Sequence, residues 1–187
     1  LSVTYHRQFG TPVKLVRPFN VYGPGLRLDD QRVLPDYLTC LLEDRAIELL
    51  TKSVKLAGES GFAWWQGGRL LDLAEIAGGA GRTGDAERWL LEGLAVLLPL
   101  RDRQLLVYGL AMLAALEAER GHAQRAGQLW GAVEAEEQRG AIGQWESARE
   151  EYERAVLAHA DSMLEAGREA GRLLSLEDAV ERALSPG

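Results

Sequence analysis

The chain has 187 residues, of which 47% are hydrophobic and 26% are charged, and this composition excludes disorder throughout the chain. Residues 1–50 carry equal numbers of acidic and basic side chains, so the formal net charge of −7 comes from residues 51–187. Because an acidic surface repels phosphate backbones, we expect no nucleic-acid binding by the chain itself, and no apolar run is long enough to cross a membrane.

Cysteine and histidine are scarce and scattered. Cys40 is the sole cysteine, which rules out an internal disulfide and is typical of a reducing, cytoplasmic compartment. His6, His122 and His159 lie far apart and have no metal-ligand spacing, so we expect no bound metal. The chain begins with Leu1 rather than methionine, which predicts a fragment or a processed piece of a longer protein.

The first 50 residues differ in composition from the rest. Four of the chain's six prolines lie before residue 36, among β-branched residues and glycines. The run VKLVRP (13–18) predicts a short strand, FNVYGPG (19–25) a turn-rich loop, and Pro35 the start of a helix. A single strand is not stable in water, because its backbone groups need partners. We therefore expect residues 1–50 to be an incomplete α/β fragment.

Residues 51–187 are rich in alanine, leucine, glutamate and arginine, which are strong helix formers. Ser175 and Asp178 have the pattern of a helix start, because both side chains can satisfy the free amides of a first turn. The predicted helices span about residues 46–59, 64–79, 84–98, 103–120, 122–138, 145–166 and 175–184. The glycines expected to separate them are Gly61, Gly81, Gly84, Gly121 and Gly140.

An internal repeat is visible within this helical part. Residues 71–90 align with a segment about 37 residues further on, so that Gly84 meets Gly121. A period in this range, with paired antiparallel helices, is typical of a helical solenoid. We expect a mainly α protein in which residues 51–187 form a tetratricopeptide-like repeat array. A protein or peptide partner is expected on its concave face, while an uncapped end would equally allow a homo-oligomer.

Five tryptophans lie in the predicted helices. Trp64 and Trp65 are adjacent, and adjacent residues point about 100° apart on a helix. We therefore expect one ring in the core and the other partly exposed, where it is a candidate partner-binding residue. The remaining three, Trp89, Trp130 and Trp145, are predicted to be core residues between helices.

Two segments of the helical part resemble a known class of protein. RAGQLWGAVEAEEQRG (125–140) and AGRLLSLEDAVERAL (170–184) are similar to recurring segments in the C-terminal region of bacterial transcriptional regulators of the LuxR and AfsR types. The resemblance covers about residues 53–184 and implies a tetratricopeptide-like region beside an ATPase and a DNA-binding domain. This chain has neither a nucleotide-binding loop nor a helix-turn-helix, so the resemblance implies no ATP hydrolysis and no DNA binding here.

The segment YHRQFGTPVKLVRPFNVYGPGLRLDDQRVLPDYL (5–38) resembles extended short-chain dehydrogenases that act on sugar nucleotides, of the NAD-dependent epimerase/dehydratase family. It is similar to the stretch after the catalytic helix in UDP-glucuronate decarboxylases and dTDP-glucose dehydratases. The resemblance implies that Asn20 contacts the substrate and that Val21 lines the nicotinamide side. It further implies positions near the cofactor or nucleotide for Tyr5, Gln8 and Arg32.

The chain departs from that family at its catalytic parts. No glycine-rich loop for the pyrophosphate stands at its start, so a complete Rossmann domain is not expected. The Tyr-x-x-x-Lys pair is also missing, since Tyr5 is followed at the fourth position by Phe9. We therefore expect no catalytic residues in this chain and no cofactor, with NAD expected only if the chain is an enzyme.

The sequence is consistent with three hypotheses. In the first, the chain is a non-catalytic interaction scaffold, a helical-repeat piece of a bacterial transcriptional regulator. In the second, it is a truncated NAD-dependent sugar-nucleotide epimerase, dehydratase or decarboxylase. In the third, two unrelated fragments have fused into a product without selected activity.

Overall fold

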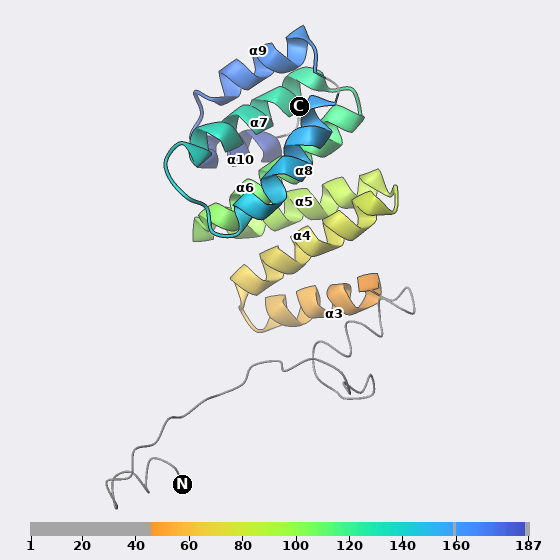
Figure 1. Cartoon of the computed structure of the whole chain (residues 1–187). Helices are drawn as coiled ribbons and strands as arrows, with labels where there is room; N and C mark the ends of the chain where they lie inside the picture. Colours follow the sequence, from red (N-terminus) through yellow and green to blue (C-terminus); the bar gives the residue numbers. More distant parts are fainter. Residues whose placement is uncertain (1–45, 159, 186–187) are drawn as a thin grey trace, which may run out of the picture. The chain divides into compact units, whose positions relative to one another are not determined.

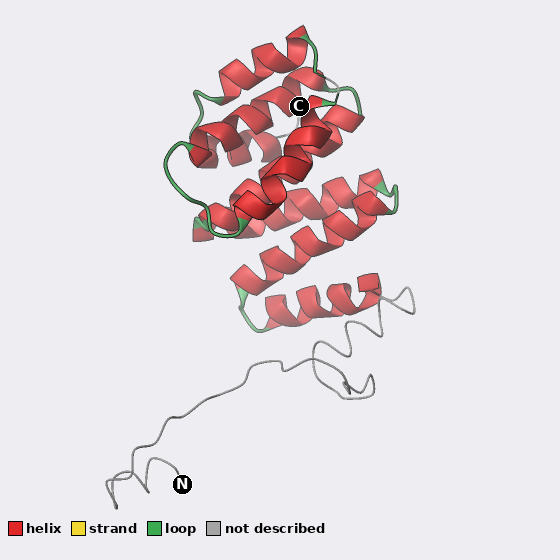
Figure 2. Cartoon of the chain, in the orientation of Figure 1, coloured by secondary structure: helices red, strands yellow, loops and turns green. Residues whose placement is uncertain are grey.

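The computed structural model describes residues 46–158 and 160–185, and these residues form helices joined by short loops (Figure 1, Figure 2). No strand occurs within these two ranges, so the predicted mainly α class is confirmed. The chain divides into two units between Ala46 and Ile47, and the described helices lie almost wholly in the second. The strand predicted at 13–18 lies outside the described residues, as do the loop at 19–25 and the helix starting at Pro35.

Eight α-helices and one short 3₁₀ turn make up the described part of the chain. Seven of the helices begin or end within two residues of a predicted boundary, because glycines and polar caps mark their ends. The elements are α3 (Ala46–Glu59), α4 (Ala63–Gly79), α5 (Thr83–Leu97), η1 (Leu98–Leu100), α6 (Arg103–Glu119), α7 (Ala123–Glu137), α8 (Trp145–Leu157), α9 (Ser162–Gly171) and α10 (Leu176–Leu184).

Tight turns of one kind connect α3 to α4, α4 to α5, and α6 to α7. In each turn a glycine has a positive φ, which is 70° at Gly61, 72° at Gly81 and 78° at Gly121. The amide of Gly81 donates to the carbonyl oxygen of Gly78 at 2.9 Å, and the amide of Gly121 donates to that of Ala118 at 3.0 Å. These bonds satisfy carbonyls at the helix ends and reverse the chain within three residues.

The turn glycines correct the register expected for the repeat. Gly81 and Gly121 occupy equivalent turns, so the hairpins α4–α5 and α6–α7 correspond at a shift of 40 residues rather than 37. Gly84, which was expected to pair with Gly121 and to separate helices, lies in the first turn of α5. Alanine and leucine are frequent in both segments and match at several shifts, whereas a positive φ strongly favours glycine.

The core forms around α6, which contacts α4, α5, α7, α8 and α10. Buried side chains surround this helix on most of its circumference, among them Leu106, Val107, Leu110 and Leu113. The last helix, α10, packs against α5, α6 and α7, and so bridges two successive hairpins. Its start is the predicted one, since Ser175 Oγ accepts a hydrogen bond of 3.1 Å from the Asp178 amide.

The single helix predicted over residues 145–166 is wrong, because the chain forms two helices there. α8 ends at Leu157, and α9 begins at Ser162 with Asp161 as its cap. Asp161 Oδ1 accepts a hydrogen bond of 2.7 Å from the Leu164 amide. A carboxylate in this position satisfies an amide that a continuous helix would have satisfied internally.

The helices α7 and α9 pack backbone against backbone. Gly127 and Gly131 on α7 lie against the backbone of α9, and Gly167 and Gly171 on α9 lie against the backbone of α7. A Cβ atom at Gly131 would lie 2.1 Å from the carbonyl oxygen of Arg168, far inside any real contact. All four positions are this close to the opposite backbone, so the spacing of the two helices depends on the absence of side chains.

An ion cluster lies at the end of this glycine contact. Arg168 Nε donates to both carboxylate oxygens of Glu134, at 2.9 and 3.0 Å, and Arg172 Nε donates to one of them at 2.9 Å. Burial alone would raise the pKa of Glu134, but hydrogen bonds from the two guanidinium groups outweigh it and lower the pKa. Glu134 is therefore a fixed anion that ties α9 to α7.

Candidate binding groove

The candidate site residues from the sequence fall into two groups. Tyr5, Gln8, Asn20, Val21 and Arg32 lie outside the described residues. The candidate partner-binding residues Trp64 and Trp65 lie in the first turn of α4.

Both tryptophans of α4 are half-exposed, with 51% of Trp64 and 47% of Trp65 accessible. The expectation that one of them lies in the core is wrong. The partner helix α5 ends at Leu97, whose side chain packs on Gly67, so the first turn of α4 extends beyond the part that α5 covers. Trp130 and Trp145 are buried as predicted, and Trp89 is partly buried against the core.

Each exposed tryptophan is held by a polar neighbour. Trp64 Nε1 donates a hydrogen bond of 2.7 Å to Asp102, whose other carboxylate oxygen accepts from the Leu105 amide at 2.9 Å at the start of α6. The guanidinium of Arg69 lies over the ring of Trp65, 4.7 Å from its centre. The two rings are therefore presented in fixed positions at one end of α4.

These tryptophans stand at the mouth of a groove bounded by α4, α6 and α8. A cavity of about 310 Å³ extends from Trp64 and Trp65 to Tyr108 and Tyr152. A second cavity of about 280 Å³ continues along α4 and α6 and shares Glu75, Met112 and Tyr152 with the first. Because they share these walls, we treat the two cavities as one surface and name it the α4–α8 groove.

Two tyrosines line the groove near α8, and two buried tryptophans lie behind them. Tyr152 stacks on the buried Trp145 at 5.8 Å with an interplanar angle of 17°, and Tyr108 meets Trp145 edge-on at 5.3 Å. Trp130 lies behind them, 6.4 Å from Trp145. The stacking fixes the ring of Tyr152, which lines both cavities of the groove.

Carboxylates line the same groove. They come from three helices: Asp72 and Glu75 from α4, Glu119 from α6, and Glu151 from α8. The basic side chain in the lining is Arg69, which pairs with Asp72 at 2.9 Å. Among the residues that the structure describes, no basic group pairs with the other three carboxylates. Four anions and one cation give the groove a net charge of −3 when all are ionised.

The carboxylates influence one another and the nearby tyrosine. Burial raises the pKa of Asp72, and Arg69 opposes that effect. Partial burial raises the pKa of Glu75, and the negative charges of Asp72 and Glu151 raise it further. Burial, with Glu75 and Glu151 nearby, also raises the pKa of Tyr152 well above its usual value. Tyr152 is thus a neutral phenol beside Glu75, whose charged form is disfavoured in the folded chain.

The sequence could not reveal this site beyond its two tryptophans. Asp72 and Glu75 look like the solvated face of a helix, and Glu151 and Tyr152 lie more than seventy residues further on. Only the packing of α8 on α6 brings them to one surface. The spacing of Asp72 and Glu75, three positions apart on one helix face, was the available signal.

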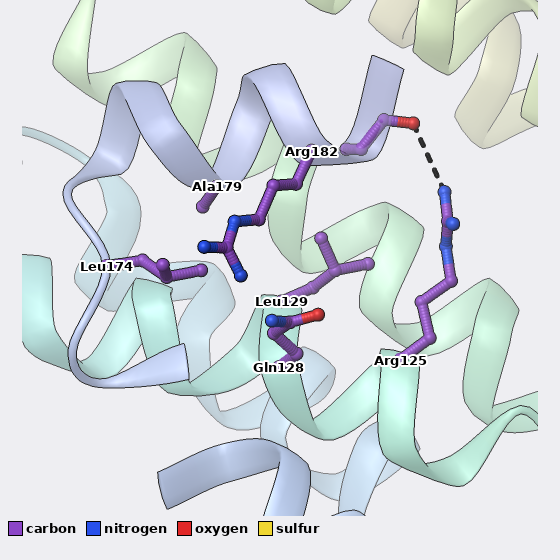
Figure 3. Close-up of a pocket in the computed structure, with 7 residues that line it drawn as sticks. Arg125, Gln128, Leu129, Leu174, Ala179 and Arg182 are labelled. Carbon is purple, nitrogen blue, oxygen red and sulfur yellow. Dashed lines mark hydrogen bonds between the residues drawn. The ribbon is translucent and has the colours of Figure 1, made fainter. Parts of the chain in front are cut away.

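Another cavity, between α7 and α10, has a different character (Figure 3). Its volume is about 30 Å³, which suits a water molecule rather than a side chain or ligand. The figure shows Arg125 donating to the carbonyl oxygen of Ala183, a bond of 3.1 Å. Because the cavity is this small and Arg125 already binds α10 across it, we assign it to packing.

Across residues 46–158 and 160–185, no cluster of three or more histidine, cysteine, aspartate or glutamate side chains could hold a metal ion. No helix among the described residues is long and apolar enough to span a bilayer.

Comparison with known proteins bears on the first part of the chain. The sequence model of the NAD dependent epimerase/dehydratase family matches residues 1–77, a range that includes α3 and most of α4. UDP-glucuronic acid decarboxylases 5, 3 and 6 of Arabidopsis thaliana are each 38% identical over 47 residues. That stretch is 25% of this chain and 14% of each relative, so the chain spans a small part of their length.

No solved structure matches the chain. The resemblance of residues 53–184 to LuxR- and AfsR-type regulators stays a prediction. The resemblance of the N-terminal part is confirmed at the level of the family: residues 1–77 match the NAD dependent epimerase/dehydratase family.

Proposed function

We propose that the helical part of this chain is a non-catalytic scaffold that binds a segment of another protein in the α4–α8 groove. The observation that supports it best is the pair of adjoining cavities along α4, α6 and α8, with exposed aromatic rings at one end. Each of its two cavities is close to the lower end of the sizes at which proteins bind ligands. Together they suit an elongated occupant such as a peptide segment.

The chemistry of the groove suits recognition of a segment. Trp64 and Trp65 offer large apolar faces and are held in place by Asp102 and Arg69. Tryptophan and tyrosine dominate the binding energy of many interfaces, because they bury much surface with few rotatable bonds. A helical module of this kind fits the sensor region of a bacterial transcriptional regulator, which is the context that the sequence resemblance implies.

A groove-filling variant tests this function. A Cβ atom at Gly68, in the groove wall, would have Leu105 at 3.9 Å as its nearest neighbour, so a side chain can start there with an ordinary contact and extend into the groove. We expect Gly68→Phe to keep the fold and to abolish binding of peptides selected from a random display library on the full chain. The matched control is Gly84→Phe, since a Cβ at Gly84 would meet nothing within 4 Å and lies outside the groove.

Peptides that bind the wild type and Gly84→Phe but not Gly68→Phe support the groove. Peptides that bind all three proteins equally would contradict it. If instead binding maps to the exposed Leu56 and Phe62, which border an apolar hollow with the two tryptophans, the groove is again the wrong surface. If the chain self-associates through that hollow, sedimentation velocity will show a dimer. In that case Gly68→Phe will leave peptide binding unchanged.

A second function has a specific observation in its favour. The family match over residues 1–77 supports an origin in an NAD-dependent enzyme of sugar nucleotides, of which this chain would be a truncated form. Thermal denaturation with NAD, with UDP-glucuronic acid, and with both tests it, because a ligand of the native state raises the melting temperature. A rise with both ligands would favour the enzyme. No peptide binding and no thermal shift would leave a fusion product without selected activity.

A further inference from the structure

We propose that the α4–α8 groove selects a cationic segment, and that an arginine of this segment lies on Tyr152 between Glu75 and Glu151. This inference rests on the proposed function, since it names the chemistry of the occupant of the same groove. It depends on three features of the groove: its uncompensated charge, its aromatic wall, and the accessibility of the carboxylates.

The charge of the groove calls for a positive occupant. Glu75, Glu119 and Glu151 have no basic partner among the described residues, although ion pairs satisfy many other carboxylates of the chain, such as Glu134 and Glu136. All three are exposed enough to meet a ligand. A positive segment entering the groove would supply the missing partner, whereas an acidic segment would add to the repulsion.

The carboxylates stand close enough to influence each other in the free protein. Glu75 lines both cavities of the groove, with Asp72 in the wall of the first and Glu151 in the wall of the second, and the negative charges of both raise the pKa of Glu75. Repulsion between these carboxylates does not stabilise the folded chain. A bound cation would remove it, so the arrangement is better suited to binding than to folding.

The aromatic wall favours a guanidinium over an ammonium group. Tyr152 stacks on Trp145 and lines both cavities of the groove, and its hydroxyl stays protonated beside Glu75 and Glu151. A planar guanidinium can lie flat on such a ring and donate in its plane to carboxylates on either side. The chain already contains this arrangement at the groove mouth, where Arg69 lies on Trp65 and pairs with Asp72.

Matched peptides test the inference on the full 187-residue chain. The probe is a labelled peptide of alternating arginine and leucine, followed by fluorescence anisotropy. Its neutral counterpart carries citrulline, which keeps the shape of arginine without the charge, and a third peptide carries lysine. We expect the arginine peptide to bind at least about ten-fold more tightly than the citrulline peptide, with the lysine peptide between them. Equal binding of the arginine and citrulline peptides would overturn the inference.

Matched variants test whether Glu75 and Glu151 are the source of the preference for the arginine peptide. The double variant Glu75→Gln/Glu151→Gln should lose about ten-fold in affinity for the arginine peptide and keep its affinity for the citrulline peptide. Its melting temperature should equal or exceed that of the wild type, which separates a binding role from a structural one. The control is Glu150→Gln, because Glu150 neighbours Glu151 in α8, lies on the surface and does not line the groove. An equal loss in the control would mean that net charge alone attracts the peptide, and would refute the site.

The two proposals fail in different ways. If Gly68→Phe blocks all three peptides while the double variant binds the arginine peptide normally, the groove binds segments but not through these carboxylates. If Gly68→Phe blocks none of them, the groove itself is not the binding surface, and both proposals fall.

Discussion

The glycine contact between α7 and α9 makes a sharp prediction about stability. Replacing Gly131 by alanine adds one methyl group, and its carbon would lie 2.1 Å from the carbonyl oxygen of Arg168. Real contacts of this kind lie beyond 3.0 Å, so the helices must separate by about 1 Å. The neighbour is backbone and cannot rotate away, so relief requires α9 to move as a whole.

The expected cost combines two opposing contributions. Overpacking of a tight interior costs about 1–3 kcal/mol and occasionally more. Alanine in place of glycine within a helix returns about 1 kcal/mol. Because the contact is backbone to backbone, we take the upper end of the first range and expect Gly131→Ala to lose about 2 kcal/mol of unfolding free energy. For a chain of this size that corresponds to a fall of about 4–8 °C in the melting temperature.

Urea denaturation followed by far-ultraviolet circular dichroism measures this loss. The control is Gly84→Ala, the same chemical change in a helix where a Cβ would meet nothing within 4 Å. It should gain up to about 1 kcal/mol, since only the helix preference changes. If Gly131→Ala proves as stable as the wild type while Gly84→Ala behaves as expected, the described spacing of α7 and α9 is wrong.

Three further predictions concern single carboxylates. Glu134→Gln should lower the free energy of unfolding by about 2–3 kcal/mol at neutral pH in urea denaturation, because it leaves two guanidinium groups without their anion. Since the pKa of Glu134 is lowered in the folded chain, this loss should fade as the pH drops through that lowered pKa. Glu75→Gln should instead raise the melting temperature slightly at neutral pH, because the pKa of Glu75 is raised in the folded chain and its charged form is disfavoured there. This gain should vanish below pH 4.5, the ordinary pKa of the side chain, where Glu75 is protonated in both the folded and the unfolded chain. Asp102→Ala should cost about 1 kcal/mol through the lost cap of α6, and acrylamide should quench Trp64 more strongly.

Each of these has an outcome that contradicts it. A Glu134→Gln chain with unchanged stability at neutral pH would show that the cluster is too solvated to matter. A fall in melting temperature for Glu75→Gln would mean that this carboxylate has a stabilising partner. Unaltered quenching in Asp102→Ala, with Trp64→Phe as the reference for the signal, would mean that the indole is fixed by other contacts.

Helix positions were largely predictable from the sequence. Their ends carry local signals, such as the positive-φ glycine at Gly61 or the hydroxyl of Ser175, which act within one turn of the helix. The break between α8 and α9 was missed because its local signal is weak: Asp161 stands among residues that favour helix on both sides. The 37-residue register failed for a related reason, since repeated alanines and leucines match at several shifts.

The groove was less predictable because it depends on tertiary packing. Trp64 and Trp65 stood out as rare residues, but their exposure follows from where α5 ends, which the sequence around them does not contain. Glu75 and Glu151 gain their significance from the packing of α8 beside α6, and no spacing rule connects positions so far apart. The close contact of α7 and α9 was in principle visible, as glycines four apart at Gly127 and Gly131 and again at Gly167 and Gly171.

The placement of α10 has a consequence for how the array comes apart. In an ordinary stacked array each hairpin contacts only its neighbours, so terminal units can fray and reclose separately. Here α10 crosses α5, α6 and α7, and Arg125 on α7 donates to its Ala183 carbonyl. Because α10 contacts both hairpins, we expect them to open together, so that their amides exchange with deuterium in one cooperative step. Under a pulling force on the C-terminus, α10 would have to peel away before either hairpin could open.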